Sequence, residues 1–534
     1  MKKSILASSI AAAVFGLGAV TGAQAAGDIL LVPYFSAQGA NATLLSIVNT
    51  DTVNGKAVKV RFRGAANSDD LFDFQVFLSP ADVFTANIAK GADGRAVMTT
   101  TDASCTKPAA SVLNATPFLT GRLDPLLTTE QKANGTREGY IEIINMADIP
   151  KNATTGSGVS GMPVTSTTDA TNPLFTAIKH VKSVAPCSGT AYTALDASAA
   201  LGGGATPAAT YGMTPGTGGL MANWTIVNTV NAAAFGGEAT ALSFTATKVI
   251  YAPQIGGAVS AADIVNWSAD PLFLAGNTVS VLDATNNVLK VGTGTASAVT
   301  PGMYDLPDLS TPLTATTPAA QVTAITTALT SSRIANEFAV ESAINGSTDW
   351  VFSMPSRRYH VAMAYSKISA TDDGRRWNRI LNNEGTMATS TVTNVNTTDG
   401  IAGSQTVFGR AGTSLFTTPD KITLICVTSP TVTPYDREEN TPTSSTTVVV
   451  SPSTVAGSTK LCGETAVMSF NNGAGTTKAL EASVAVTAID VGYAAGWATM
   501  SNTFPIIGGA FTRAAFGAQG FGIYRDHRFT GLPN

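Results

Sequence analysis

Alternation of apolar and polar residues is the most regular feature of this chain. In the segment 56–63, Val58, Val60 and Phe62 alternate with Lys59, Arg61 and Arg63. A period of two is that of a β-strand with one buried face and one face in water. We therefore expect the three cationic side chains on the solvent side of a sheet.

Two similar runs flank this one, at 42–49 and 72–78. Between the first two runs lies the pair Asn54-Gly55, which readily takes the positive φ angles of a tight hairpin turn. Residues 42–88 therefore predict three consecutive antiparallel strands, the start of a β-sandwich.

The remaining pattern predicts further short strands separated by turns. They are expected at 28–35, 139–145, 224–228, 239–252, 278–282, 288–291, 333–341, 348–354, 359–365, 422–427, 446–450, 466–470, 482–488 and 496–500. Pro33 marks the first as an edge strand, one short helix is expected at 319–329, and the tail from Phe504 is rich in loops. The fold class predicted is all-β, with antiparallel, immunoglobulin-like sandwiches and long loop insertions.

Three of the expected strands end in asparagine, at Asn49, Asn145 and Asn228. Asparagine tolerates the left-handed conformation and caps turns with its side chain. The three endings predict a recurring strand-to-turn device, with an internal repeat as the lesser alternative.

The chain of 534 residues exceeds one typical domain. Residues 1–25 predict a signal peptide, because a basic start and an apolar run precede the small-residue site Ala23-Gln24-Ala25. Residues 26–315 predict an N-terminal sandwich region with a Gly/Ala/Thr-rich insertion at about 151–222, and residues 333–534 a C-terminal one. No later run offers the roughly 20 apolar residues of a spanning helix. We expect an exported protein on the cell surface, at the extracellular side of an outer membrane.

Charge is sparse in this sequence. Charged residues make up 13% of the chain, with a net charge of −4, against about 25% charged residues in a typical soluble domain. The absence of a Lys/Arg cluster argues against a nucleic-acid partner. Surfaces rich in Thr, Ala and Gly lose little hydration when they pack together, which favours self-assembly over an ordinary secreted β protein.

The four cysteines are Cys105, Cys187, Cys426 and Cys462. An even number in an exported chain favours disulfides. We expect the pairs 105–187 and 426–462, because each then closes a loop within one half of the chain. A metal site is the alternative, although no C-x-x-C and no histidine at ligand spacing supports it.

No catalytic motif accompanies the strands. The G-x-G-x-x-G match at 156–161 lies in a Ser/Thr/Gly-rich stretch without the helix that a dinucleotide site requires. His180, His360 and His527 are not part of a recognised nucleophile motif. We expect Asp526 and His527 to form an exposed polar cluster, and we do not expect an enzyme.

Two acidic groups are weak candidates for binding Ca²⁺, which prefers several carboxylate and carbonyl oxygens. They are Asp69, Asp70 and Asp73, and the pair Asp372 and Asp373. Neither has EF-hand spacing, and a solvated acidic turn is the commoner explanation for each. No other cofactor is expected.

Six short segments resemble exported bacterial cell-surface proteins, including surface-layer-like ones. They are Val32-Pro-Tyr-Phe35, the strand 58–62, residues 73–83, Gly139-Tyr-Ile-Glu142, Asp349-Trp350-Val with Pro355, and Tyr435-Asp-Arg-Glu438. The resemblance implies immunoglobulin-like sandwich architecture and a role at the cell surface. It supplies no mechanism.

The leading hypothesis is a structural protein that assembles with copies of itself into a surface layer or similar array and attaches to outer envelope components, with Ca²⁺ as a candidate bridge between copies. Lys59, Arg61 and Arg63 are the first candidates for subunit contacts. The alternative is a surface adhesin or carbohydrate-binding protein that presents Trp377 and Tyr435 to its ligand. An outer-membrane porin is less favoured, because no series of ten-residue alternating strands with aromatic girdles is evident.

Overall fold

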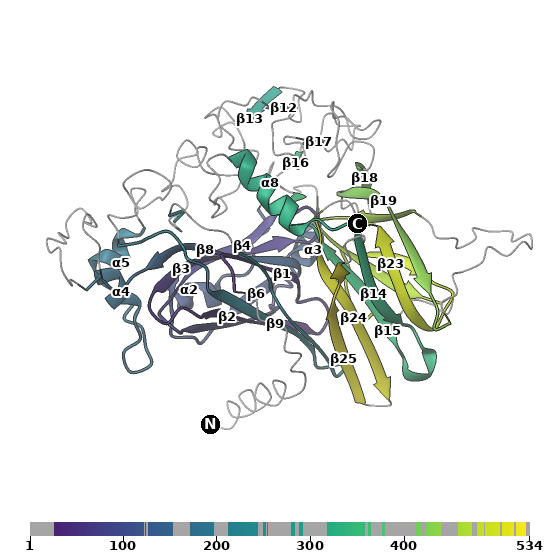
Figure 1. Ribbon diagram of the computed structural model, residues 1–534, viewed down its shortest axis with the longest axis horizontal. Coiled ribbons are helices and arrows are strands. Elements are labelled where there is room, and N and C mark those ends of the chain that lie inside the picture. The colour runs from purple at the N-terminus through teal and green to yellow at the C-terminus, as the bar shows by residue number, and fades with distance from the viewer. Residues whose placement is uncertain are drawn as a thin grey trace, which may run out of the picture.

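Two pairs of packed β-sheets form the body of the protein, which is described by a computed structural model (Figure 1). The structure describes residues 26–121, 123, 127–152, 171–196, 212–243, 249–251, 254, 279–282, 288–291, 318–357, 361–364, 376–379, 413–417, 423–438, 458–472, 478–484, 486–501, 505–516 and 519–529. The predicted all-β class with antiparallel sheets is confirmed, since every strand pair in this part of the chain is antiparallel except β21–β22. Immunoglobulin-like connectivity stays a prediction.

The first pair of sheets comes from the N-terminal part of the chain. Sheet A has the order β11 (Thr240–Leu242), β1 (Ile29–Ser36), β8 (Glu138–Ile149), β3 (Gly55–Gly64), β4 (Asp70–Leu78) and β7 (Cys105–Lys107). Sheet B has the order β10 (Ala233–Glu238), β9 (Leu220–Asn228), β2 (Asn41–Asn49), β5 (Val83–Lys90) and β6 (Ala96–Thr99).

The second pair comes from the C-terminal part. Sheet C has the order β18 (Thr413–Thr417), β19 (Thr423–Tyr435), β23 (Ala495–Ser501), β14 (Arg333–Ala339) and β26 (Arg528–Phe529), with β20 (Ser458–Cys462) also paired to β19. Sheet D has the order β22 (Val486–Asp490), β21 (Thr465–Asn471), β15 (Ser347–Ser353), β24 (Ile507–Phe516) and β25 (Gln519–Asp526). The predicted boundary at 315–333 itself stays a prediction.

Short elements decorate these sheets. The described helices are α2 (Ala110–Ala115), α3 (Thr129–Gly135), α4 (Pro173–Ile178), α5 (Thr190–Ala194), α8 (Pro318–Leu329) and the 3-10 turn η4 (Ser342–Ile344). Two hairpins join β12 (Val279–Leu282) to β13 (Val288–Val291) and β16 (Val361–Ala364) to β17 (Arg376–Arg379). The predicted helix at 319–329 and the predicted hairpin across 278–291 are confirmed. None of the described helices is both long and apolar enough to cross a membrane.

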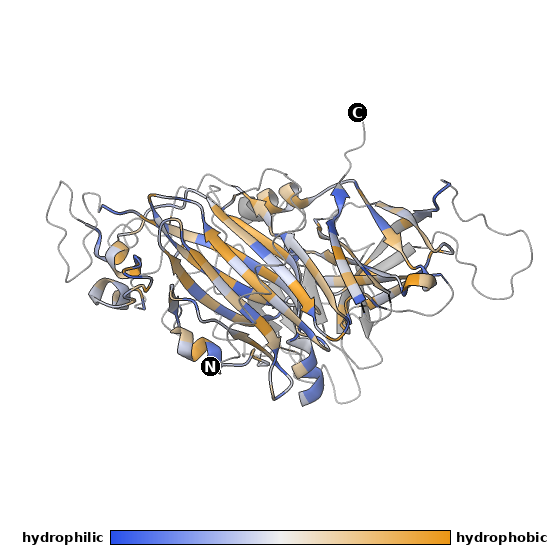
Figure 2. Cartoon of the chain, turned by 90° about the horizontal axis from the view of Figure 1, so that it is seen from below, coloured by the Kyte–Doolittle hydropathy of each residue, from blue (hydrophilic) through white to orange (hydrophobic). Residues whose placement is uncertain are grey.

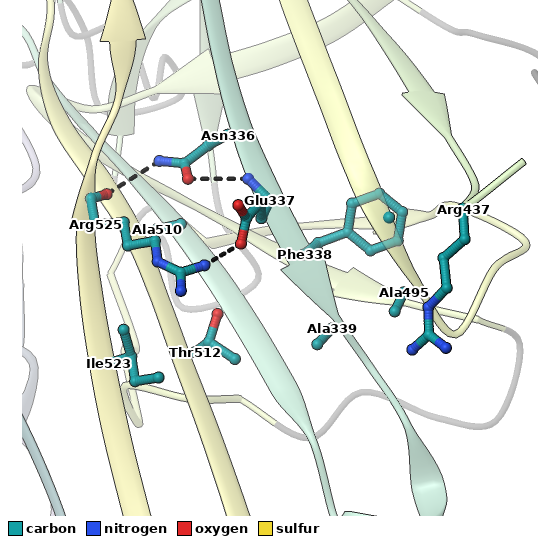
Figure 3. A pocket seen from close by; sticks show the side chains of 11 residues that line it. Asn336, Glu337, Phe338, Ala339, Arg437, Ala495, Ala510, Thr512, Ile523 and Arg525 are labelled. Atoms are coloured by element: carbon teal, nitrogen blue, oxygen red, sulfur yellow. Dashed lines mark hydrogen bonds and ion pairs between the residues drawn. The ribbon is translucent and has the colours of Figure 1, made fainter. Parts of the chain in front are cut away.

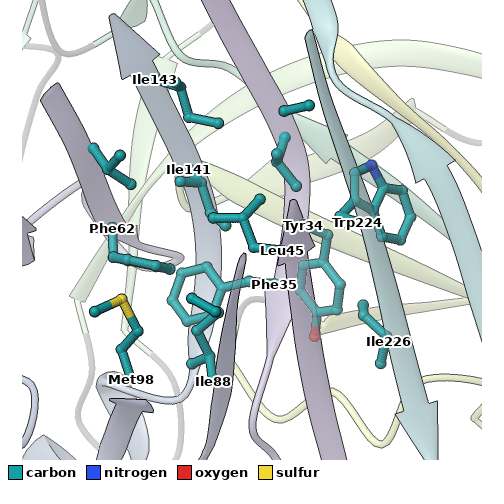
Figure 4. Close-up of a cluster of buried hydrophobic side chains, with 14 of the residues drawn as sticks. Tyr34, Phe35, Leu45, Phe62, Ile88, Met98, Ile141, Ile143, Trp224 and Ile226 are labelled. Atoms are coloured by element: carbon teal, nitrogen blue, oxygen red, sulfur yellow. The ribbon is translucent and has the colours of Figure 1, made fainter. Parts of the chain in front are cut away.

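A first hydrophobic core fills the space between sheets A and B (Figure 4). Apolar side chains from both sheets meet there, among them Phe35, Phe62 and Trp224, each at most 1% exposed. Burial of one such side chain contributes about 1.5–3 kcal/mol. Val351 and Phe511 of sheet D belong to the same core. The face of sheet D that is turned away from sheet C therefore packs on one end of the first sandwich. The opposite face of sheet D packs on sheet C in a second core, with Trp350, Phe352 and Met500.

Residues 42–88 do not form one three-stranded sheet as predicted. β3 and β4 pair with each other, but β2 pairs with β5 and β9 in sheet B. The loop at Asn54 therefore crosses between sheets, and it is not a hairpin turn. Its backbone is held by Asp51, whose carboxylate accepts hydrogen bonds from the N–H groups of Val53 and Asn54. A period of two identifies the faces of a strand but not its partner.

Pro33 does not mark an edge strand. β1 lies between β11 and β8, and its register with β8 shifts between Val32 and Phe35. Such a bulge interrupts the ladder where proline has no N–H to donate. The prediction was wrong because a bulge tolerates proline as well as an edge does.

The tail from Phe504 is not rich in loops. It contains β24, β25 and β26, and its glycines allow close packing of β25 on β10. A Cβ atom at Gly522 would lie 2.6 Å from the carbonyl oxygen of Ala234, and one at Gly520 would lie 2.5 Å from that of Asn231. Glycine in this strand therefore lets the backbone of β25 lie close to the backbone of β10 and of the turn before it.

The asparagine device is confirmed at two of its three positions. The Asn49 side chain donates to the carbonyl of Asn54, and the Oδ1 atom of Asn228 accepts from the N–H groups of Val230 and Asn231. Asn145 differs, because β8 continues past it to Ile149.

Both predicted disulfides are present, Cys105–Cys187 and Cys426–Cys462. The predicted insertion at 151–222 is more than a decorated loop, since Leu174 and Ile178 of α4 and Tyr192 of α5 are buried against sheet A. Of the strand predicted at 239–252, the described residues 239–243 and 249–251 contain β11, and the strand predicted at 446–450 lies outside the described residues.

Candidate functional site

The predicted solvent face of β3 is buried. Lys59, Arg61 and Arg63 are at most 2% exposed, although they do lie opposite Val58, Val60 and Phe62 as the alternation indicated. The face carries a second layer of chain, because Ala57 on the same side packs in one cluster with α4, α5, residues 249–251 and α8. The three cations are therefore not on the surface, where a subunit contact would need them.

Carboxylates accompany these buried cations. Arg61 is directly opposite both Asp73 on β4 and Glu142 on β8. The Nζ atom of Lys59 lies 2.7 Å from Asp73 Oδ1, and Arg63 Nε lies 3.2 Å from Glu142 Oε2. Burial raises the pKa of Asp73, but the charge and hydrogen bond of Lys59, the hydrogen bond from Gln254 and the charge of Arg61 together outweigh it and hold that pKa below its usual range. Neutralising pairs of this kind are what burial of charge requires.

The Ca²⁺ candidates do not form a solvated turn. Asp69 and Asp70 are 2% and 4% exposed, and Asp73 is occupied by Lys59. Within the described chain, no group of three or more His, Cys, Asp or Glu side chains is arranged to hold a metal ion. Asp372 and Asp373 lie outside the described residues, as does the glycine motif at 156–161.

His527 is not part of an exposed cluster. It is 3% exposed and packs on Trp350 and Phe352, with Nε2 3.0 Å from the carbonyl oxygen of Val351. Burial lowers its pKa to about 3. Asp526 instead accepts a hydrogen bond from the Tyr524 hydroxyl. The buried imidazole is a neutral structural group.

His180 is close to a serine and an aspartate, but not as a catalytic triad requires. Its Nδ1 atom lies 3.2 Å from Ser79 Oγ and 3.4 Å from Asp82 Oδ2. A triad uses one ring nitrogen for the serine and the other for the aspartate. Both contacts here compete for one nitrogen, so the aspartate cannot orient the ring toward the serine. His360 lies outside the described residues.

The outer face of sheet B is almost free of charge. Its outward positions form four rows across the strands: Ala234–Val227–Ala42–Ala89–Val97, Gly236–Thr225–Leu44–Asn87–Thr99, Glu238–Asn223–Ser46–Thr85 and Met221–Val48–Val83. Glu238, on the edge strand, is the one charged residue among these positions. Leu44 and Val83 are 42% and 43% exposed. Figure 2 shows the strands of this sandwich as alternating hydrophobic and hydrophilic positions.

A groove lies on the second sandwich. It consists of two adjoining pockets of about 280 and 390 Å³ that share Asn336, Glu337, Arg437 and Gly496. The first opens between β14 and β25, and the second extends over the outer face of sheet C to Trp497. Figure 3 shows the first pocket, with the Glu337–Arg525 ion pair on one side and Arg437 on the other.

An aromatic pair borders this groove. The rings of Tyr435 and Trp497 stack with their centroids 4.4 Å apart and their planes 14° apart. Trp497 lies directly between Tyr435 and Glu337 in the strand register, and it is 38% exposed. We singled out Tyr435 from the sequence but missed Trp497. Its alternation with Ala498 in 496–500 was the available signal, because it placed Trp497 on the outward face. For Trp377, in β17, the side chain is outside the described part.

The free edge of β14 beside the groove is closed to a further strand. β26 covers β14 only at Ile334 and Ala335. Beyond it, the carbonyl of Glu337 accepts from Trp350 Nε1, and the Ala339 N–H donates to Thr348 Oγ1. Side chains thus occupy the backbone groups that an added strand would pair with.

No family model matches this chain, and neither a curated protein nor a solved structure matches it. The resemblance to surface-layer-like proteins therefore rests on its short sequence segments alone.

Proposed function

We propose that this protein is a noncatalytic structural protein, exported to the cell surface, that associates laterally with copies of itself into a surface layer or similar array. The observation that carries the proposal is the outer face of sheet B, on which Glu238 at the edge strand is the one charged outward residue. Two disulfides and the lack of a spanning helix among the described residues are compatible with an extracellular location.

The nearly uncharged face suits a second copy of the same chain. When a surface meets itself, every charge near its centre meets a like charge or must lose its hydration. Here Leu44 on the middle strand is surrounded by Thr225 and Asn87, and Glu238 lies on the edge strand. Neither repulsion nor loss of charge hydration therefore opposes contact at the centre.

The size of the face fits a modest interface. With strands about 4.8 Å apart and same-face residues about 6.7 Å apart along a strand, the four rows cover roughly 550 Å² on each copy. Two copies would bury roughly 1,100 Å², the low end for specific interfaces. A face that meets a copy of itself joins two chains, so an array would be built from such pairs through additional contacts.

Placing a charge at the centre of the face tests the proposal. We expect Leu44→Lys to weaken association of the mature chain at least tenfold, because two ammonium groups would meet across the interface. Sedimentation velocity over a concentration series measures the association constant. We expect association to persist in EDTA, since the face has no carboxylate cluster.

Val181→Lys is the matched control, because Val181 is 62% exposed and lies off sheet B. It adds the same charge and should leave association unchanged. A wild-type chain that stays monomeric at high concentration, or equal effects of the two lysines, would refute the role of this face.

A further inference from the structure

We propose that the groove beside Trp497 binds an acidic polysaccharide, with a uronic acid ring stacked on the indole and carboxylates held by Arg437 and Arg528. The site lies on the second sandwich, apart from the sheet B face proposed for self-association.

The indole offers a platform for a sugar ring. Tyr435 covers one face of Trp497, and the stacking holds the indole in one orientation. The exposed part of Trp497 borders the pocket that Glu337 and Arg528 also line. A rigid aromatic ring with one side packed and the other wet loses little entropy on binding the apolar C–H face of a sugar.

The charges around the groove favour an anion. Its lining carries three arginines, Arg437, Arg525 and Arg528, against the carboxylates of Glu337 and Asp436. Arg525 is paired with Glu337. Arg437 and Arg528 are exposed and, within the described chain, form no ion pair. A guanidinium group binds a carboxylate through two parallel hydrogen bonds, so these two arginines are available for the carboxylates of uronate residues.

The same charges argue against an apolar ligand. A peptide strand is disfavoured because side chains already occupy the backbone groups at the edge of β14. The larger pocket, about 390 Å³, is within the range of small-ligand sites. Its continuation into the first pocket, with which it shares four lining residues, suits an extended chain better than a single small molecule. The surface at Trp497 therefore fits an oligomer of ring-shaped, hydroxyl-bearing and anionic units.

Calorimetric titration of the protein with a panel of uronate-containing tetrasaccharides tests the proposal. Each acidic tetrasaccharide is compared with the same oligomer after its carboxyl groups are reduced to alcohols. We expect at least one acidic member to bind at least tenfold more tightly than its reduced form, and the difference to shrink at high salt.

Substitutions in the groove test whether this binding takes place there. Trp497→Ala and Arg437→Gln are each expected to lose at least tenfold in affinity, while Trp497→Phe retains an aromatic face and most of the binding. Phe521→Ala and Arg95→Gln are the controls, since Phe521 is an exposed ring and Arg95 a cation outside both pockets. Binding by no member of the panel, equal binding of acidic and reduced forms, or full binding by both groove variants would overturn the proposal.

Discussion

At the scale of single residues, alternation gave the correct faces but the wrong environment. Lys59, Arg61 and Arg63 do share one face of β3, yet that face is buried beneath helices and loops from distant parts of the chain. A cationic residue in an alternating strand indicates a solvent-exposed face only if no other segment covers that face of the sheet. The carboxylates that neutralise these cations were themselves expected in solvated turns or were not singled out.

Reversing one of these charges tests the buried network. Arg61→Glu would place a third carboxylate beside Glu142 and Asp73. We expect a loss of at least about 3–5 kcal/mol in the free energy of unfolding, the cost of an uncompensated buried charge. Chemical denaturation followed by circular dichroism measures it.

The matched control is Arg95→Glu, because Arg95 forms its ion pair with Asp93 near the surface. We expect a change of about 1 kcal/mol or less there. Equal stability of the two variants would mean that the network contributes little.

His527 gives the chain a pH dependence that its sequence did not indicate. Burial lowers its pKa to about 3, whereas an unfolded histidine has a pKa of about 6.5. Below about pH 6.5 the unfolded chain therefore binds a proton that the folded chain does not, and stability falls as the pH falls toward 3. The slope from this residue is at most about 1.4 kcal/mol per pH unit.

We expect this slope to be absent in His527→Gln, whose side chain does not titrate. Free energies of unfolding between pH 7 and pH 4.5 measure the slope in both proteins, so that a constant loss of stability in the variant does not affect the comparison. An unchanged slope would show that other groups cause the pH dependence.

At the scale of elements, the local pattern of apolar and polar residues located most strands but did not determine which strands pair with each other. β2 and β3 follow each other in the chain but belong to different sheets, because a connection of a few residues can cross a sandwich as easily as it can form a hairpin. The glycines of β25 resembled those of a loop, but Gly520 and Gly522 allow the backbone to approach a segment nearly 300 residues earlier in the chain. The groove depends on the same kind of contact: it needs β14, β23 and β25 together.

At the scale of the whole molecule, the two sandwiches share a polar seam as well as a core. Glu138 of β8 is buried there, and its carboxylate accepts hydrogen bonds from the Tyr34 hydroxyl and from the N–H groups of Ser483 and Val484. Burial raises the pKa of Glu138, although these hydrogen bonds partly oppose the rise. One carboxylate thus connects the first sandwich to the segment that leads into β22.

Two substitutions of Glu138 measure this connection. Glu138→Ala leaves the N–H groups of Ser483 and Val484 buried without their acceptor, at about 1–3 kcal/mol for each. Glu138→Gln keeps an oxygen for them and should cost less than half as much. Thermal unfolding by calorimetry compares both with the wild type. Equal losses in the two variants would show that the seam does not depend on this acceptor.

The sequence by itself determined the strand-rich class, the two faces of the clearest strands and the short helix at 319–329, and it favoured the observed disulfide pairs among the three pairings that four cysteines allow. These features depend on residues close together in the chain or on cysteines, whose pairing is chemically restricted. Only the tertiary structure decided which faces are wet. It buried Lys59, Arg61, Arg63 and His527 and left Leu44 and Trp497 exposed. The physical reason is that solvent exposure depends on what packs over a surface, and here the covering segments come from far along the chain.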